Sequence, residues 1–421
     1  MVVNVALKEG DVVIPLREAE AATCGGKAAG LGAMLRAGLP VPDGFVVPFA
    51  VHRVVVRERA RHDPLRGGPA TTPESSRDRP LPRALLDAVG VALGRLGAPA
   101  VAVRSSATGE DSPQASAAGQ YETTLAVHGL PAVAGAIGTC WASLLSPRAT
   151  AYRSGTGPAE LSGEEPAMAV LVQRHLDADV SGVMFTPTGV EGATAIESAW
   201  GLGAGVVAGT VTPDTFRVGA DGTVTGTVAD KRTRLDRIGT QLLTRGVPAG
   251  DRRRASLDEP LARELAALGG KVAETLGSPQ DIEWAVADGG VWLLQARPIT
   301  VAPPPIGGTA SSPRPGSVLT GIPGSAGVAT GTARTVRGPD DFSRVRSGDI
   351  LVCPFTDPAW TPLLRLAGGV VTETGGALSH AAIVAREFGI PAVLGLPGAL
   401  TSIPDGAAVT VDGTTGAVTA S

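Results

Sequence analysis

The segment GGVVTETGGALSHAAIVAREFGIPAVLG, residues 368–395, carries the clearest structural pattern in the chain. Its apolar start predicts a strand, and the glycine pair at 375–376 predicts a turn after it. A helix is expected to begin near Ser379 and to stop before Gly389. A buried strand followed by a turn and a helix indicates an α/β arrangement here.

His380 falls in the first turn of that predicted helix. The helix dipole and the unpaired amides of a first turn suit a neutral imidazole nucleophile and stabilise negative charge placed on its ring. A single histidine is more often structural, so spacing alone leaves both interpretations open.

The clearest break in the chain is VAPPPIGGTASSPRPGS, residues 301–317, where periodic patterning gives way to proline, glycine and serine. We interpret it as a flexible linker. A large domain of mixed helices and strands is expected over residues 1–300 and a small one over 318–421. A second polar run, roughly Arg57 to Pro82, predicts an exposed loop.

Composition indicates a globular protein of two or three domains, with 421 residues, 43% hydrophobic and 18% charged. The net charge is −4 and the basic residues form no dense patch, which argues against nucleic acid and anionic membranes as partners. Cys24, Cys140 and Cys353 show no metal or disulfide spacing, so reduced, packed thiols are expected. The N-terminus lacks a signal-peptide pattern and no stretch resembles a membrane span, so a cytoplasmic location is expected.

Near the N-terminus, CGGKAAGLGAMLRAGLPVPDGFVV, residues 24–47, predicts a glycine turn and a helix from about Ala28 to Ala37. Lys27 at the helix start would add charge where the dipole already favours a phosphate. The alternative is a surface lysine after a turn.

Two further segments fit a nucleotide site. VAVRSSATGEDSPQASAAGQYETT, residues 101–124, runs from a strand ending at Arg104 into a loop of small residues that could cover phosphates. AMAVLVQRHLDADVSGVMFT, residues 167–186, places Gln173, Arg174, His175 and Leu176 between two apolar strands, where backbone groups could bind adenine. Plain connections, a simple hairpin in the second case, are the alternatives.

The segment DIEWAVADGGVWLLQARPIT, residues 281–300, predicts a hairpin with a three-residue loop at 288–290. Glu283 then lies opposite Gln295, and Asp281 opposite Arg297, on one face. Such a face can hold Mg²⁺ and a polyphosphate, or it can be a solvated surface with an ion pair. The opposite face, toward the core, would carry Ile282, Trp284, Leu294 and Ala296.

Taken together, these motifs resemble the phosphohistidine dikinase superfamily, which includes phosphoenolpyruvate synthase, pyruvate phosphate dikinase and rifampin phosphotransferase. GGKAAGL, VRSSATGED, GLGAGVVAGTVTPD, and DIEW with LLQARPIT look like successive motifs of its ATP-grasp domain. GGALSHAAIVAREFGIPAVLG looks like its swivelling phosphohistidine domain. The resemblance implies an α/β fold in which the linker joins these two domains.

The resemblance also implies roles for individual residues, with ATP and Mg²⁺ as cofactors. Lys27, Arg104 and Arg297 would bind phosphates, and the segment from Gln173 to Leu176 would meet adenine. Glu283 and Gln295 would hold Mg²⁺ with Asp281 beside them. His380 would carry the phosphoryl group.

Three departures from the family pattern stand out. The glutamate expected after GLG is Ala204, and the threonine found two residues before the histidine in the pyruvate enzymes is Leu378. Neither a pyruvate-binding barrel nor a drug-binding domain is recognised in the chain.

The sequence thus predicts an ATP-dependent phosphotransferase that phosphorylates His380, releases AMP and phosphate, and passes the phosphoryl group to an unidentified small acceptor. The alternative is a phosphocarrier or ATP-activating subunit that serves a separate acceptor-binding protein.

Overall fold

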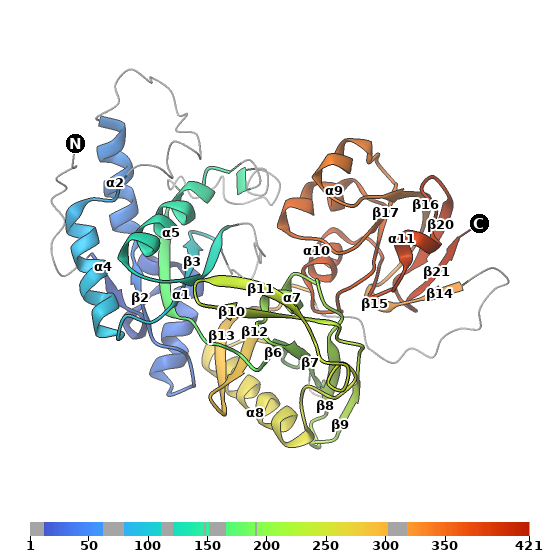
Figure 1. Cartoon of the computed structure of the whole chain (residues 1–421), viewed down its shortest axis with the longest axis horizontal. Coiled ribbons are helices and arrows are strands. Elements are labelled where there is room, and N and C mark those ends of the chain that lie inside the picture. The colour runs from blue at the N-terminus through green and yellow to red at the C-terminus, as the bar shows by residue number, and fades with distance from the viewer. Residues whose placement is uncertain are drawn as a thin grey trace.

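The computed structural model describes residues 12–61, 80–110, 121–146, 149–150, 166–189, 192–301 and 318–420. All of the predicted linker except its first residue, and most of the polar run after Arg61, lie outside these ranges. We call residues 12–301 the N-terminal part and residues 318–420 the C-terminal part (Figure 1).

The N-terminal part begins with a five-stranded sheet in the order β1 (Ile14–Pro15), β2 (Gly44–Val47), β5 (Met168–Arg174), β3 (Val101–Ala107) and β4 (Thr123–Val127). Helices α2 (Phe49–Arg61), α4 (Arg83–Arg95) and α5 (Leu130–Ser143) pack on one face around a buried core. Helix α1 (Ala21–Arg36) packs on the other face. The expectation that the polar run is a loop from Arg57 onward is wrong for its first five residues, which continue α2.

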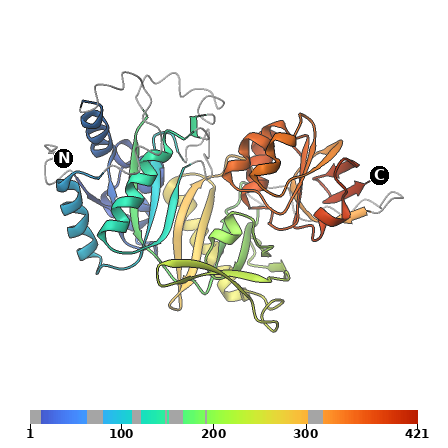
Figure 2. The ribbon, with the colours of Figure 1, turned by 45° about the horizontal axis from the view of Figure 1, so that its top comes forward.

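A second sheet has the order β13 (Gly290–Pro298), β12 (Gln280–Ala287), β6 (Val180–Phe185), β7 (Thr194–Trp200), β8 (Asp214–Val218) and β9 (Val224–Thr227). Helix α8 (Glu259–Leu276) covers one face and shares a core with α1, which joins the two sheets. Short helix α7 (Ala204–Val207) and hairpin β10 (Thr233–Ile238) and β11 (Gln241–Gly246) complete this part. Figure 2 shows β12 and β13 between the first sheet and the green strands of the second.

The C-terminal part is built on eight strands in the order β14 (Val318–Thr320), β21 (Ala417–Ala420), β20 (Ala408–Asp412), β16 (Val328–Thr335), β17 (Ile350–Cys353), β18 (Gly369–Thr372), β19 (Ala392–Leu394) and β15 (Ile322–Ser325). Helices α9 (Thr361–Leu366) and α10 (His380–Phe388) pack over one core, and α11 (Ala399–Ser402) over another. The predicted strand, turn and helix of residues 368–395 are confirmed, with α10 ending at left-handed Gly389.

Helix α1 differs from its prediction at its start. The helical run begins at Ala21 rather than near Ala28, and it is interrupted at Gly25, whose φ is +81°. A side chain at Gly25 would collide with Ser106 of β3, because a Cβ there would lie 2.9 Å from the Ser106 carbonyl oxygen. The Ser106 hydroxyl donates to the Cys24 carbonyl at 2.7 Å. This break aims the following turn, with Lys27, across the end of β3.

Candidate active site

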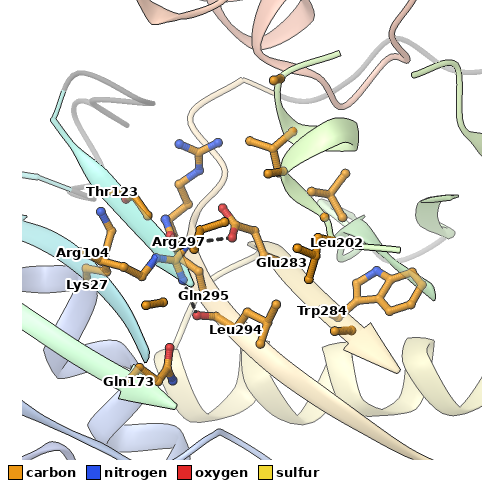
Figure 3. Close-up of a pocket in the computed structure, with 18 of the residues that line it drawn as sticks. Lys27, Arg104, Thr123, Gln173, Leu202, Glu283, Trp284, Leu294, Gln295 and Arg297 are labelled. Atoms are coloured by element: carbon orange, nitrogen blue, oxygen red, sulfur yellow. Dashed lines mark hydrogen bonds and ion pairs between the residues drawn. The ribbon is translucent and has the colours of Figure 1, made fainter. Parts of the chain in front are cut away.

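A pocket of about 460 Å³ lies between the two sheets of the N-terminal part and is bordered by α10 of the C-terminal part. This volume falls within the range of small-molecule sites, roughly 300–1,000 Å³. Figure 3 shows that the labelled charged and polar side chains converge on it from several elements. All predicted site residues line it: Lys27, Arg104, Gln173, Arg174, His175, Leu176, Asp281, Glu283, Gln295, Arg297 and His380.

Lys27 is buried and its ammonium lies 2.5 Å from the Glu110 carboxylate. The second Glu110 oxygen accepts the Ala107 amide at 2.8 Å, which fixes the carboxylate just after β3. Sequence reasoning did not assign Glu110 a role, although it belongs to the quoted VRSSATGED motif. The pair holds the only lysine of this segment inside the pocket wall rather than at the surface, so the surface-lysine alternative is wrong.

Arg104 connects the first sheet to the second. Its guanidinium donates to Glu283 Oε2 and to the Leu294 carbonyl, both at 2.8 Å (Figure 3). Burial raises the pKa of Glu283, but the charge and hydrogen bond of Arg104, with the charges of Arg297 and Lys27, outweigh it and bring the pKa below its ordinary value. Glu283 is therefore ionised and can bind a cation.

The β12–β13 hairpin pairs Glu283 with Gln295 and Asp281 with Arg297, as predicted. Arg297 donates to Asp281 Oδ2 through Nε at 2.9 Å, and its Nη2 lies 2.7 Å from the same oxygen. The four polar side chains thus share one pocket-facing side of the hairpin. Since Asp281 and Gln295 are buried, the alternative of a solvated surface is wrong.

The predicted three-residue loop is wrong. Ala287 pairs with Gly290, which leaves a two-residue turn of Asp288 (φ 52°) and Gly289 (φ 74°), the positive angles of a type I′ turn. The extra residue lies instead at Leu294, where a β-bulge shifts the register between Glu283 and Trp284.

That bulge also corrects the predicted face of Leu294. Its side chain packs with Leu202 and Ala285 at the pocket, not with the main core. Its carbonyl is turned out of the ladder toward Arg104.

Gln173 and Arg174 end β5 instead of lying between two strands, and residues 175–179 lead from β5 in the first sheet to β6 in the second. The simple-hairpin alternative is therefore wrong. Gln173 is buried and donates its side-chain amide to the Pro42 carbonyl at 3.0 Å. The backbone amides of Arg174 and His175 donate to the Asp43 and Ala100 carbonyls.

His175 and Arg174 differ in environment. Burial lowers the pKa of His175, an effect that Asp177 opposes and Arg237 reinforces. Arg174 is exposed and donates to the Leu96 carbonyl at 2.6 Å. Both residues line the pocket.

His380 is the first residue of α10 and is 4% exposed. Its Nδ1 lies 3.1 Å from the hydroxyl of Thr356, a residue that sequence reasoning missed. Thr356 precedes a short 3₁₀ turn, and nothing in its local pattern distinguishes it from any loop threonine. The contact orients the imidazole ring at the pocket edge.

The C-terminal part contacts the N-terminal part beside this pocket. Leu378 and Ile383 pack into an apolar cluster formed by β6, β7 and α7. Thr374 Oγ1 donates to the Gly209 carbonyl at 2.6 Å. His380 is thereby held at the edge of the pocket that Glu283 and Arg104 also line.

Family models match nearly the whole chain. Residues 21–310 match the pyruvate phosphate dikinase AMP/ATP-binding domain, and residues 345–416 match the mobile domain of PEP-utilising enzymes. The chain belongs to the phosphohistidine dikinase superfamily. This membership confirms the predicted fold class, an ATP-grasp domain followed by a swivelling histidine domain, and the family's cofactors, ATP and Mg²⁺.

Relatives in this superfamily include a probable phosphoenolpyruvate synthase of Methanothermobacter thermautotrophicus, 35% identical over 94% of this chain and 61% of that protein. The phosphoenolpyruvate synthase of Aeropyrum pernix is 38% identical over 94% of this chain and 56% of that protein. The chain thus spans less than two thirds of these relatives' length. A solved structure of an Enzyme I (nEIt) protein is 32% identical over a match that covers 19% of this chain and 33% of that protein. Its TM-score of 0.18 carries no weight for the fold.

Other predictions concern the rest of the molecule. Cys24, Cys140 and Cys353 are free and buried, as expected, and burial raises the pKa of the Cys140 thiol to about 12. Within the described residues, no helix is long and apolar enough to cross a membrane.

Proposed function

We propose that this chain is a dikinase-type phosphotransferase in which His380 takes a phosphoryl group from ATP. The observation that carries the proposal is that His380 lines the same pocket as Lys27, Arg104, Glu283 and Gln295. In the proposed reaction, a His380 nitrogen attacks the β-phosphorus of ATP and forms an N–P bond as the bond from that phosphorus to the AMP oxygen breaks, so AMP leaves. Water then cleaves the bond between the β- and γ-phosphoryl groups, so that phosphate leaves and the β-phosphoryl group stays on the histidine.

The domain division belongs to this proposal. We assign nucleotide binding to residues 1–300, the linker to 301–317 and phosphoryl carriage to 318–421. Support comes from the hydrophobic clusters, since two large ones lie wholly in the N-terminal part and two wholly in the C-terminal part.

Phosphate binding falls to Lys27, Arg104 and Arg297. Each of these cations lies beside one carboxylate, Glu110, Glu283 and Asp281 respectively. A polyphosphate entering the pocket competes for these contacts, so its binding exchanges one set of charge-assisted hydrogen bonds for another. Such fixed charges provide the electrostatic stabilisation on which phosphoryl transfer depends.

Magnesium fits a donor set that lies beside these cations. The Glu283 carboxylate and the Gln295 side-chain oxygen face each other across the hairpin and both line the pocket. Mg²⁺ prefers such hard oxygens and completes its shell with phosphate oxygens and water. When bound, it neutralises charge on the phosphates.

We assign adenine binding to residues 173–176, which lie at the end of β5 and just after it and line the pocket. The Arg174 and His175 amides already donate to carbonyls of the first sheet. We therefore assign recognition of the adenine edge to the Leu176 backbone, with the buried Gln173 side chain beside it.

His380 acts as nucleophile through Nε2 in this proposal, because the Thr356 hydroxyl occupies Nδ1 at 3.1 Å. The contact with Thr356 orients the ring before ATP binds. The main contribution of the C-terminal part is therefore to position the nucleophile.

The test is incubation of pure protein with Mg²⁺ and ATP labelled at the β-phosphate. Wild type should release AMP and acquire acid-labile phosphate. His380→Ala should bind ATP with unchanged affinity and acquire none, whereas Lys27→Ala and Glu283→Ala should lose both turnover and phosphoenzyme. Acid-labile phosphate on His380→Ala would rule out the assignment.

The acceptor is proposed to be a small molecule. A second proposal is a carrier that serves a separate acceptor-binding protein, and the separate hydrophobic cores of the C-terminal part, which carries His380, support it. AMP release distinguishes the two: sustained turnover with one small molecule, pyruvate being the first to try, supports the enzyme. A single stoichiometric burst that cell extract converts to turnover supports the carrier.

A further inference from the structure

Glu197 of β7 is a buried carboxylate whose position none of the roles above explains. It is 2% exposed and points across the contact between the two parts. A methyl group placed on Gly376, four residues before His380, would lie 2.4 Å from both Glu197 carboxylate oxygens. The carboxylate therefore lies directly against the backbone of the turn that leads into α10.

Three of the four groups that act on the Glu197 carboxylate belong to the C-terminal part. Burial raises its pKa to about 7, while the amides of Leu378 and Ala377 and the charge of Arg386 act in the opposite direction, and Asp281 adds to the rise. Arg386 is itself buried, donates from Nε to the Gly324 carbonyl at 2.8 Å and donates to the Ala377 carbonyl. The Glu197 side chain thus lies against a turn whose backbone is also bound by Arg386, through the Ala377 carbonyl.

We propose that Glu197 is a positioning residue: its contact with residues 376–378 sets the docked position of the C-terminal part and so places His380 at the nucleotide pocket. This inference rests on the proposed function for its kinetic consequence, but the docking contact itself does not. The apolar packing of Leu378 and Ile383 brings the two parts together without fixing their register, whereas the close fit of the Glu197 side chain against the turn at Gly376 restricts the docked position.

Gly376 provides a probe that acts mainly in the docked state. The three atoms nearest to a Cβ at this position all belong to the Glu197 carboxylate, and its φ lies outside the left-handed region. Alanine at 376 should therefore be tolerated by the turn but not by the docked arrangement. Gly338 is the matched control, since a Cβ there meets no atom within 4 Å.

The experiment measures the distance between spin labels on the two parts. Labels at Glu274→Cys on α8 and Thr401→Cys on α11 use exposed positions, and the three native thiols are buried. The same proteins are assayed for the rate of phosphoenzyme formation at saturating ATP and for ATP affinity.

Gly376→Ala should broaden and lengthen the distance distribution and slow phosphoenzyme formation about tenfold, because the added Cβ overpacks the docked contact with the Glu197 carboxylate. Gly338→Ala should change neither, and ATP affinity should stay constant throughout. Glu197→Ala should slow the reaction similarly, and adding Gly376→Ala to it should cause no further loss. Glu197→Gln, which keeps the shape and one acceptor oxygen, should remain within about twofold of wild type.

Where Glu197→Ala unfolds the protein, Glu197→Asp serves instead: its shorter side chain should relieve the penalty of Gly376→Ala. Equal penalties from Gly376→Ala in the wild-type, Glu197→Asp and Glu197→Ala backgrounds would overturn the proposal, as would unchanged label distances in Gly376→Ala. If wild type forms no phosphohistidine, the proposed function fails, but the distances still decide the docking role of Glu197.

Discussion

Single side chains in this site work in opposed pairs. Lys27 with Glu110 and Arg104 with Glu283 join residues 83 and 179 positions apart in the chain. An unpaired buried charge is far more costly than a paired one. The carboxylates therefore let the pocket keep its cations buried, and substitution of either member should affect folding as well as nucleotide binding.

Thr356→Val tests the orientation of His380. Valine keeps the shape of the side chain but removes the hydroxyl that contacts Nδ1 at 3.1 Å. We expect phosphoenzyme formation to slow about tenfold, since a net hydrogen bond contributes about 1–1.5 kcal/mol. Thr356→Ser should retain most of the rate, and ATP affinity measured by calorimetry should not change. A valine variant as fast as wild type would show that packing alone orients the ring.

Glu197 should make docking depend on pH. Burial raises its pKa to about 7 from an ordinary 4.5, so the docked state binds this proton more tightly than the exposed side chain does. The stability that protonated Glu197 adds to the docked state is therefore fully present below the ordinary pKa and is lost as pH rises through about 7. Arg386 and Asp281 are the charged groups coupled to it.

We expect label distances to lengthen between about pH 6 and about pH 8 in wild type. Glu197→Gln has no such proton to lose and should give a flatter profile. An identical profile in both proteins would assign the pH dependence to another group.

At the scale of one element, the break in α1 makes a quantitative prediction. Gly25→Ala would force a side chain into a left-handed conformation and against Ser106. We expect a loss of about 1–3 kcal/mol in the free energy of unfolding, together with weaker ATP binding because Lys27 moves. Chemical denaturation and calorimetry measure the two effects.

Gly270→Ala on α8 is the matched control, because Gly270 is exposed and a Cβ there meets nothing within 4 Å. Helix propensity predicts a gain of about 0.5–1 kcal/mol for this variant. A loss equal to that of Gly25→Ala would mean that the left-handed break is not what α1 requires.

Elements with local rules were predictable from the sequence. Strand alternation paired Glu283 with Gln295, and helix signals bounded α10 to within a residue. The same rules could not locate the β-bulge at Leu294, because a two-residue turn with a bulge and a three-residue turn give the same pairs beyond it.

Contacts between distant elements were beyond local rules. Glu197 and Thr356 are ordinary strand and loop residues until the two parts of the chain meet at residues 376–380. Glu110 stood inside a quoted motif, but its partner Lys27 is 83 residues away. Only the resemblance to a family brought the site residues together before the fold was known.

The whole molecule consists of two parts with separate cores joined by an apolar contact around Leu378. Leu378→Asp should break this contact, because a carboxylate at a position 2% exposed would be buried without a partner built for it. We expect two separate calorimetric transitions, and MgATP should raise the midpoint temperature of only the one that belongs to the N-terminal part. At a ligand concentration of 100 Kd, binding should add about 2.7 kcal/mol to the free energy of unfolding of that part. Leu378→Met keeps the apolar contact and should behave as wild type. A MgATP-dependent rise of both transitions in the aspartate variant would contradict this division.

His380 lines the pocket and is 4% exposed in this docked arrangement. If the proposed function holds, the same imidazole must therefore leave the pocket before it can react with a second substrate. In that reaction the phosphoryl group never passes directly from donor to acceptor, because each transfer goes through the histidine. Initial-velocity measurements should then give the parallel double-reciprocal lines of a ping-pong reaction. At saturating ATP and acceptor, the maximal rate is limited by how fast the C-terminal part leaves the pocket and returns to it.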